Sequence, residues 1–222
     1  MVLNLAAALS ALAVLGLVAG PAPAAPPSPV PPALVGIKPC CTDPAQFRYQ
    51  PLPSSGSIDF DISKQSPAFE FQSGLSHFQA FALPALTKPY VIEIRSYISG
   101  GPDPLRARVL YPVAAVLTDD FIVARAAGLE QLRAEIPIME QATSPAYRLA
   151  IPFEPGTSRE RYLVVFTPSH LLAEHALPPF NDPESVAVAA REAFLGASPQ
   201  GKLRITVRPV VGELPPIESL LP

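Results

Sequence analysis

The two cysteines of the chain, Cys40 and Cys41, are neighbours, and their thiols are the side chains most open to unusual chemistry. Adjacent cysteines cannot close a long loop as an ordinary disulfide does. Three states are therefore open for them: a strained vicinal disulfide, bonds to another chain, or two free thiols. As thiolates they could bind a soft metal, but no nearby His or further Cys completes such a site. We expect no metal and no cofactor.

A serine beside a histidine, Ser76 and His77, is the nearest approach to a catalytic nucleophile. The run from Gly74 begins like a nucleophile elbow, but Phe78 stands where that motif needs its second glycine. The pattern favours a turn that leads into a strand. A hydrolase would require one concave pocket that unites both side chains with a buried carboxylate. Without it, the sequence predicts no enzyme and no catalytic residue.

Histidines and paired carboxylates give no stronger indication of a site. His170 and His175 are five residues apart, so on a helix they point away from each other and cannot share a zinc ion. Asp59 and Asp61 share one face of a strand, as a glycosidase pair could, but they alternate with apolar residues. That alternation favours a solvated outer face.

Carbohydrate binding is harder to exclude, since it depends on exposed aromatic rings with amides and carboxylates nearby. The chain has no Trp. Four tyrosines are candidates, although each also suits a core or rim position: Tyr49, Tyr97, Tyr111 and Tyr147. The sequence therefore does not assign the ligand-binding residues. The net charge of −3 and the lack of a dense basic patch argue against nucleic acid as a partner.

The N-terminus has the composition of a secretory signal. Met1–Gly20 carries no charged side chain, and its apolar run is shorter than a bilayer span. Small residues at positions 22–25 supply a cleavage site, so we expect a signal peptide over residues 1–24, cleaved rather than kept as an anchor. The product would act in the cell envelope or beyond it. No lipobox precedes Cys40, which disfavours a lipid anchor there.

The rest of the chain divides into a Pro-rich extended tether over residues 25–44 and one folded domain over residues 45–222. Within the domain, alternating apolar and polar residues predict strands. The predicted strands are Ile58–Ile62, Phe69–Phe71, His77–Leu83, Tyr90–Arg95, Arg108–Leu117, Phe121–Ala124, Arg148–Phe153, Tyr162–Phe166 and Lys202–Arg208. In the fourth of these, Glu93 and Arg95 point outward.

Two helix starts stand near the C-terminus, where an N-cap residue precedes proline at Thr167–Pro168 and Asp182–Pro183. The second helix ends at Gly196. Because consecutive strands are joined by turns without a repeating strand–helix–strand alternation, we expect a mainly β protein. The predicted fold is an antiparallel β-sandwich, jelly-roll-like, with a short helical insertion near the C-terminus.

Short motifs spread from Cys40 to about Leu172 carry a family resemblance. They are Cys40-Cys41, Phe47-x-Tyr49-x-x-Leu52, Phe60-x-Ile62, Ser66-Pro67-x-Phe69-x-Phe71, Gly74-x-Ser76-x-Phe78-x-Ala80-Phe81-x-Leu83-Pro84, Pro112-Val113-x-x-Val116-Leu117 and Tyr162 to Thr167. This pattern resembles the maltose operon periplasmic protein family. The resemblance implies a non-enzymatic periplasmic accessory protein of maltose or maltodextrin uptake, with oligosaccharides or envelope transport proteins as partners. The alternative is an envelope structural or protein-interaction module without a sugar ligand.

Overall fold

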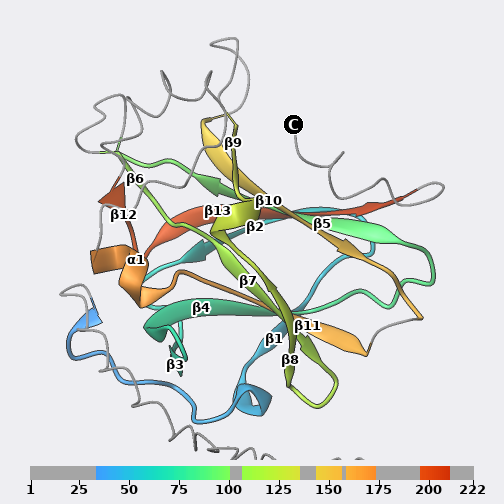
Figure 1. The fold of residues 1–222 in the computed structure, drawn as a ribbon, viewed down its shortest axis with the longest axis horizontal. Coiled ribbons are helices and arrows are strands. Elements are labelled where there is room, and N and C mark those ends of the chain that lie inside the picture. The colour runs from blue at the N-terminus through green and yellow to red at the C-terminus, as the bar shows by residue number, and fades with distance from the viewer. Residues whose placement is uncertain (1–33, 101–106, 136–143, 157–158, 174–195, 211–222) are drawn as a thin grey trace, which may run out of the picture.

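The computed structural model describes residues 34–100, 107–135, 144–156, 159–173 and 196–210. Their backbone forms two large sheets packed face to face, with one short α-helix, α1 (Ser169–Ala173), at the side (Figure 1). The prediction of a mainly β sandwich with a short helix near the C-terminus is confirmed. The longer helix predicted from Asp182 lies outside the described residues, as do the predicted signal peptide and the first part of the tether.

The first sheet has the order β1-β4-β11-β7-β8, with β3 also paired to β4, and the second has the order β2-β13-β5-β10-β9. The bounds in the first sheet are β1 (Tyr49–Pro51), β3 (Ala68–Phe71), β4 (Gly74–Ala82), β7 (Val113–Thr118), β8 (Val123–Ala127) and β11 (Glu160–Phe166). Those in the second are β2 (Gly56–Ile62), β5 (Tyr90–Tyr97), β9 (Arg133–Glu135), β10 (Ala146–Phe153) and β13 (Gly201–Pro209). A small parallel pair, β6 (Arg108–Val109) and β12 (Gly196–Ala197), completes the strands, and the 3₁₀ turns are η2 (Pro44–Gln46) and η3 (Leu129–Gln131).

Eight of these strands follow the jelly-roll order. The outermost strands of the series pair with each other, β2 with β13, and successive inner strands pair in turn: β4 with β11, β5 with β10, and β7 with β8. All four pairs are antiparallel, and their members alternate between the two sheets. A long antiparallel hairpin that folds over on itself produces this nested pairing. It is the topology of double-sheet jelly rolls.

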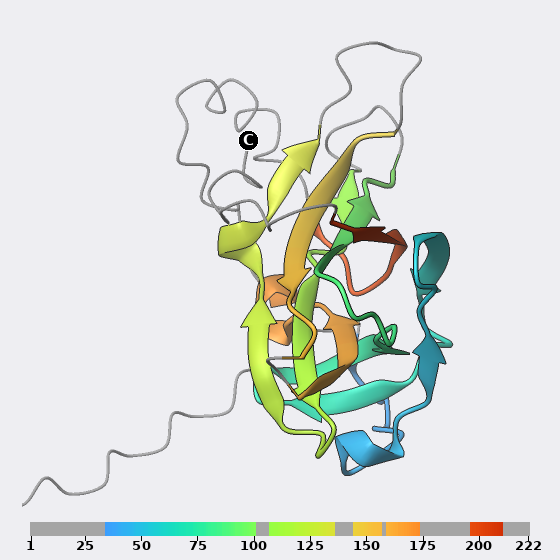
Figure 2. The same cartoon turned by 90° about the vertical axis from the view of Figure 1, so that its right-hand side faces the viewer.

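Two apolar cores hold the sandwich together. Between the sheets lies the main core, which includes Ile94, Leu149 and Ile205, all fully buried. On the outer side of the first sheet lies a second, aromatic core around Phe47, Phe78 and Phe166. Figure 2 shows η2 and β1, in blue, running along this side of the molecule. The first sheet is therefore buried on both faces, which explains the uninterrupted apolar run of β11.

The N-terminal part of the described chain lies against the sandwich. Leu34 is fully buried in a small cluster with Ala68 and Leu75. The Cys40 N–H donates a hydrogen bond to the Ala68 carbonyl (2.8 Å). Residues 34–44, which belong to the predicted tether, are thus in contact with the folded domain.

Two local predictions need correction. Glu93 is on the outer face of β5 as expected, but it is only 2 % exposed, because the guanidinium groups of Arg95, Arg148 and Arg208 close over it. The hydroxyl of Thr167 does not cap α1, because it donates instead to the Tyr111 carbonyl (2.9 Å). Both corrections involve partners from distant parts of the chain: Arg148 and Arg208 for Glu93, and Tyr111 for Thr167.

Substitution of Glu93 tests the importance of this carboxylate for stability. Glu93→Gln removes the negative charge that three guanidinium groups share, and we expect the free energy of unfolding to fall by about 2–4 kcal/mol. Urea denaturation measures it. Asp59→Asn is the control, because it breaks an exposed pair with Arg204 and should cost less than about 1 kcal/mol. Equal losses in the two variants would contradict the central role of Glu93.

Gly74 at the start of β4 is a second test of the packing. Its φ is +97°, and a Cβ there would fall against the Ser169 hydroxyl, which donates to the Ser73 carbonyl. We expect Gly74→Ala to destabilise more than Gly56→Ala by about 1 kcal/mol or more. Gly56 has nearly the same φ (+94°) but open space around it, so it measures the backbone strain alone. Thermal unfolding of both variants gives the comparison.

Candidate functional site

Cys40 and Cys41 are joined as a vicinal disulfide, one of the three states that the sequence left open. The segment after them is held by local hydrogen bonds. Asp43 caps η2, since its carboxylate accepts from the Ala45 N–H (2.7 Å), and the Tyr49 hydroxyl donates to the Pro44 carbonyl (2.8 Å). Because these bonds and the Cys40–Ala68 bond lie on either side of the disulfide, they fix its place on the sandwich.

The disulfide lines a hollow of about 500 Å³ at the edge of the first sheet, which we call the edge groove. Its position follows from a change of strand partner: β3 pairs with Gly74–His77 of β4, and β1 pairs with Ala80–Ala82. The groove opens between these two stretches. Its other lining residues are Gln46, Phe47, Arg48, Gln50, Gln65, Pro67, Phe78, Gln79 and Ala80.

Four glutamines converge on the edge groove, which is half of the eight in the chain. Gln46 and Gln65 are partly engaged, because their Oε1 atoms accept from the Thr42 N–H and the Ser63 hydroxyl (both 2.9 Å). The amides of Gln50 and Gln79 have no hydrogen bond to any other residue that the structure describes. An amide offers two donors and an acceptor with two lone pairs, so the glutamines in this lining hold hydrogen-bonding capacity that the described residues leave unused.

The rest of the groove is apolar or cationic. Cys40 is exposed and Cys41 is half-buried, and Cys41 packs against the aromatic core in which Phe47 and Phe78 are buried. Arg48 is exposed at the rim and forms no ion pair within the described ranges. No carboxylate lines the hollow. The groove can therefore bind a neutral, hydroxyl-rich molecule or one with a single anionic group, but it offers no acid or base for catalysis.

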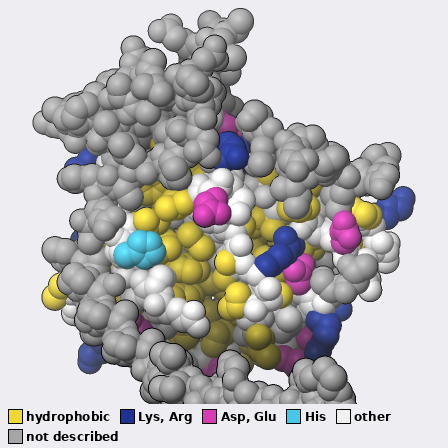
Figure 3. Space-filling view, viewed as in Figure 1, with side chains coloured by type: hydrophobic (Ala, Val, Ile, Leu, Met, Phe, Trp, Pro, Cys, Tyr) yellow, Lys and Arg dark blue, Asp and Glu magenta, His cyan; other side chains and the backbone are white. Residues whose placement is uncertain are grey.

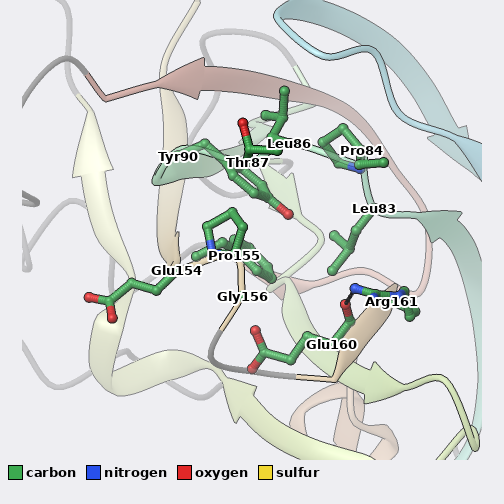
Figure 4. Close-up of a pocket in the computed structure, with 12 residues that line it drawn as sticks. Leu83, Pro84, Leu86, Thr87, Tyr90, Glu154, Pro155, Gly156, Glu160 and Arg161 are labelled. Carbon is green, nitrogen blue, oxygen red and sulfur yellow. Dashed lines mark hydrogen bonds between the residues drawn. The ribbon is translucent and has the colours of Figure 1, made fainter.

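A second hollow, of about 360 Å³, lies at one end of the sandwich between the loops at Leu83–Thr87 and Glu154–Gly156 (Figure 4). Tyr90 and Glu160 point their oxygen atoms into it (Figure 4). The Tyr90 ring stacks on Phe153 (centroids 5.0 Å apart), and Arg125 covers Phe153 and holds Glu160 through two bonds of 2.6 and 3.2 Å. The charge of Glu160 is thus already neutralised by Arg125 in the absence of a ligand. This cavity is therefore a weaker candidate for ligand binding than the edge groove.

The serine and histidine pair does not form a nucleophile and base. Ser76 and His77 are both buried and, as neighbours on β4, point to opposite faces. The Ser76 hydroxyl donates to the Thr167 carbonyl (2.7 Å), and His77 Nδ1 lies 2.9 Å from the Ser66 carbonyl oxygen. Neither residue lines the hollows described above. Within the described residues, neither of these hollows unites the two side chains with a carboxylate, as a hydrolase would require.

The four candidate tyrosines have different environments. Tyr111 and Tyr147 are each 1 % exposed and pack together in the core, so neither can stack on a sugar. Tyr49 is half-buried against Tyr162, with centroids 4.2 Å apart. Tyr97 is half-buried on the outer face of the second sheet, with the Arg204 guanidinium 6.0 Å from its ring centroid. Only Tyr97 keeps the position that sugar stacking would need.

The aspartates lie on the same outer face and are exposed, as the alternation of β2 predicts. Asp59 accepts two bonds from Arg204 (2.7 and 2.9 Å), and these bonds lower the pKa of its carboxyl group. A carboxylate held ionised in this way cannot serve as the general acid of a glycosidase. The pair therefore belongs to a solvated, charged surface.

The glutamines of the edge groove were missed by sequence reasoning. Gln46 and Gln50 flank Phe47 at helical spacing, but Gln65 and Gln79 come from other segments, and glutamine carries no motif of its own. The only sequence signal near the site was the cysteine pair. The groove contains too few ligands for a soft metal. The disulfide therefore contributes to the site as part of its wall, and not as a metal ligand.

The hydroxyl of Tyr90 allows a test of the end cavity by pH. Burial, with the nearby Glu160, raises the pKa of Tyr90 from 10.0 to about 12. Between these values the unfolded chain binds fewer protons than the folded one, so stability falls as the pH rises through this window. We expect Tyr90→Phe to fall less steeply there than wild type, although Tyr49, whose pKa burial also raises, keeps some slope. Urea titrations at pH 7 and between pH 10 and about 12 measure the free energy of unfolding of both proteins. The same dependence on pH in Tyr90→Phe and wild type would contradict a raised pKa of Tyr90.

Among the described residues, no helix is long and apolar enough to cross a membrane, and no three His, Cys, Asp or Glu side chains are grouped so that they could hold a metal ion. Comparisons of the chain with protein-family models, with curated proteins and with solved structures found no match.

Proposed function

We propose that the protein is a non-enzymatic, glycan-binding accessory protein of the periplasm, and that it holds a neutral oligosaccharide of the maltodextrin type in the edge groove. The observation that carries this proposal is the presence of four glutamines in the lining of one hollow, two of which have amides without a hydrogen-bond partner among the described residues. Neighbouring sugar hydroxyls are donors and acceptors at once, so each can satisfy both ends of an amide.

The size and walls of the groove support the same class of ligand. A hollow of about 500 Å³ falls in the usual range of small-molecule sites. The disulfide presents a rigid apolar wall to the less polar face of a sugar ring. Because η2 and the Cys40–Ala68 bond hold this wall in place, little ordering is needed on binding.

The proposed location rests on the sequence and the disulfide together. The short apolar run near the N-terminus, followed by small residues, supports an export signal, and disulfides persist in oxidising compartments such as the periplasm. The resemblance to the maltose operon periplasmic protein family agrees with this location and with a role beside envelope transport proteins. Each net hydrogen bond contributes about 1 kcal/mol, so four amides give modest affinity, as suits a protein that releases its ligand.

A protein-interaction module of the envelope is the second candidate, and one observation favours it. In the face shown in Figure 3, hydrophobic side chains gather over β7 and between it and α1, with few charges among them. At the β7–β8 turn, Ile122 and Val123 are 65 % and 58 % exposed. Exposed apolar surface of this kind often marks an interface. This reading requires no sugar ligand.

Titration calorimetry with a maltodextrin series tests the first proposal. We expect the mature protein to bind, and Gln79→Ala and Gln50→Ala each to weaken binding by about fivefold to tenfold, since each removes about one net hydrogen bond. Gln72→Ala is the matched control, because Gln72 is exposed in the turn after β3, outside the groove. Wild type that binds no member of the series would refute a maltodextrin ligand, and equal affinity of all three variants would refute the groove.

The disulfide wall is tested separately. The double variant Cys40→Ser/Cys41→Ser removes the wall and leaves all four glutamines in place, so we expect weaker maltodextrin binding with an unchanged unfolding transition of the β-sandwich. Circular dichroism checks the transition. Binding as tight as that of wild type would show that the disulfide plays no part in the site.

A further inference from the structure

Four arginines form a straight row across the outer face of the second sheet. The strand register places Arg204 of β13 opposite Arg95 of β5, Arg95 opposite Arg148 of β10, and Arg148 opposite Arg133 of β9. Directly paired residues share a face, and the core residues next to these arginines point the other way. We call these four residues the arginine row. Since neighbouring strands are about 4.8 Å apart, the row spans about 14 Å.

Such a row costs stability, because like charges directly opposite each other in a sheet repel. The chain offsets part of this cost with buried or half-buried carboxylates. Glu93 lies diagonally beside the row and binds Arg95 (3.0 Å), Arg148 (3.4 Å) and, from outside the row, Arg208. Glu135 binds Arg95 (2.8 Å) and Arg148 (3.0 Å).

The compensation is incomplete. Arg204 at one end of the row has only the exposed Asp59, and Arg133 at the other end donates to the backbone carbonyls of Glu130 and Leu132 (both 2.9 Å). Among the described strand residues of this face, cations outnumber carboxylates: Arg95, Arg133, Arg148, Lys202, Arg204 and Arg208 stand against Asp59, Asp61, Glu93 and Glu135. This excess lies on a chain whose net charge is −3.

The surface beside the row has the other groups that a sugar chain needs. Tyr97 lies two residues beyond Arg95 on the same face of β5 and lines two adjoining hollows of about 390 and 440 Å³. Asp61 and Lys202 line both, and Gln200 lines the larger. A half-exposed ring, an amide and a cation thus stand next to the line of guanidinium groups. The ring of Tyr97, the amide of Gln200 and the carboxylate of Asp61 are the kinds of group that sequence reasoning sought for carbohydrate binding.

We propose that this outer face binds an acidic polysaccharide of the polyuronate type, laid across the strands along the arginine row. A guanidinium group binds a carboxylate through two parallel N–H···O bonds, and a polyuronate presents one carboxylate on every sugar. Its chain follows the row while a pyranose ring stacks on Tyr97. The proposal goes beyond the edge groove, which lies at the edge of the other sheet and binds a neutral ligand.

Nucleic acid fits this surface less well. Binding to a duplex depends on many uncompensated cations along the backbone, whereas here Glu93 and Glu135 already neutralise the middle of the row. A single line of guanidinium groups next to Tyr97 matches one polysaccharide chain with evenly spaced carboxylates better than it matches a duplex. The same carboxylates give the row its fixed geometry, so the guanidinium groups are ordered before the ligand arrives.

Fluorescence anisotropy with labelled oligogalacturonate tests the proposal. We expect the full-length mature protein to bind with an affinity that falls with salt, and Arg133→Gln/Arg204→Gln to bind at least about tenfold more weakly with a salt slope smaller by about two. These two arginines do not contact Glu93, so the fold is preserved. Arg159→Gln/Lys64→Gln is the matched control: it removes the same charge elsewhere and should bind as wild type does.

Three outcomes would overturn the proposal: no binding by wild type, equal loss in both double variants, or equally tight binding of duplex DNA or anionic vesicles. Arg133→Lys/Arg204→Lys keeps the charge without the planar guanidinium group and should recover only part of the affinity.

The two proposed sites are separable. Gln79→Ala should retain oligogalacturonate binding, and Arg133→Gln/Arg204→Gln should retain maltodextrin binding, so failure of one proposal leaves the other standing.

Discussion

The register of β5 between β13 and β10 is the constraint on which both faces of the second sheet depend. On the inner side it brings Ile94 opposite Ile205 and Leu149 in the main core. On the outer side the same alignment places Arg95 between two other arginines and surrounds Glu93 with guanidinium groups. A slip of one residue would turn the core outward and the charges inward. The core therefore enforces a charge arrangement that electrostatics alone would oppose, and Glu93 lowers the cost of accepting it.

The two candidate binding surfaces differ in how the fold makes them. The edge groove exists because one strand, β4, exchanges β3 for β1 along its edge, so its lining comes from turns and strand ends near the N-terminus. The arginine row exists because unbroken strands lie in register, so its residues are fixed by backbone hydrogen bonds. The groove offers neutral amides beside sulfur, and the row offers fixed charge. A ligand of the groove would meet hydrogen-bond donors and acceptors, whereas a ligand of the row would meet fixed charge.

Much of the fold could be predicted from local patterns, and little of either site could. Alternation in β2, β5 and β13 predicts half-buried strands, and the apolar run of β11 predicts a central strand; both predictions hold because they depend on residues two positions apart. The jelly-roll order was also anticipated. The burial of Glu93 was not, because two of the three arginines that close over it, Arg148 and Arg208, belong to strands far from β5 in sequence. The arginine row was missed for the same reason: its members are scattered, so no basic patch appears along the chain. Gln65 and Gln79 likewise meet only after folding, and the cysteine pair marked their neighbourhood without revealing its chemistry.

The nested pairing of the strands has a consequence for the order in which the structure can form. The hydroxyls of Ser57 and Thr206 meet (2.8 Å) although they are 149 residues apart in the chain. The first strand of the second sheet, β2, cannot pair until the last strand, β13, is available. Until then β2 has an open edge and an uncovered apolar face. Folds dominated by such distant contacts form slowly. In a chain synthesised from its N-terminus, β2 therefore stays without its partner strand until β13 has been made, and its open edge needs protection against aggregation during that time.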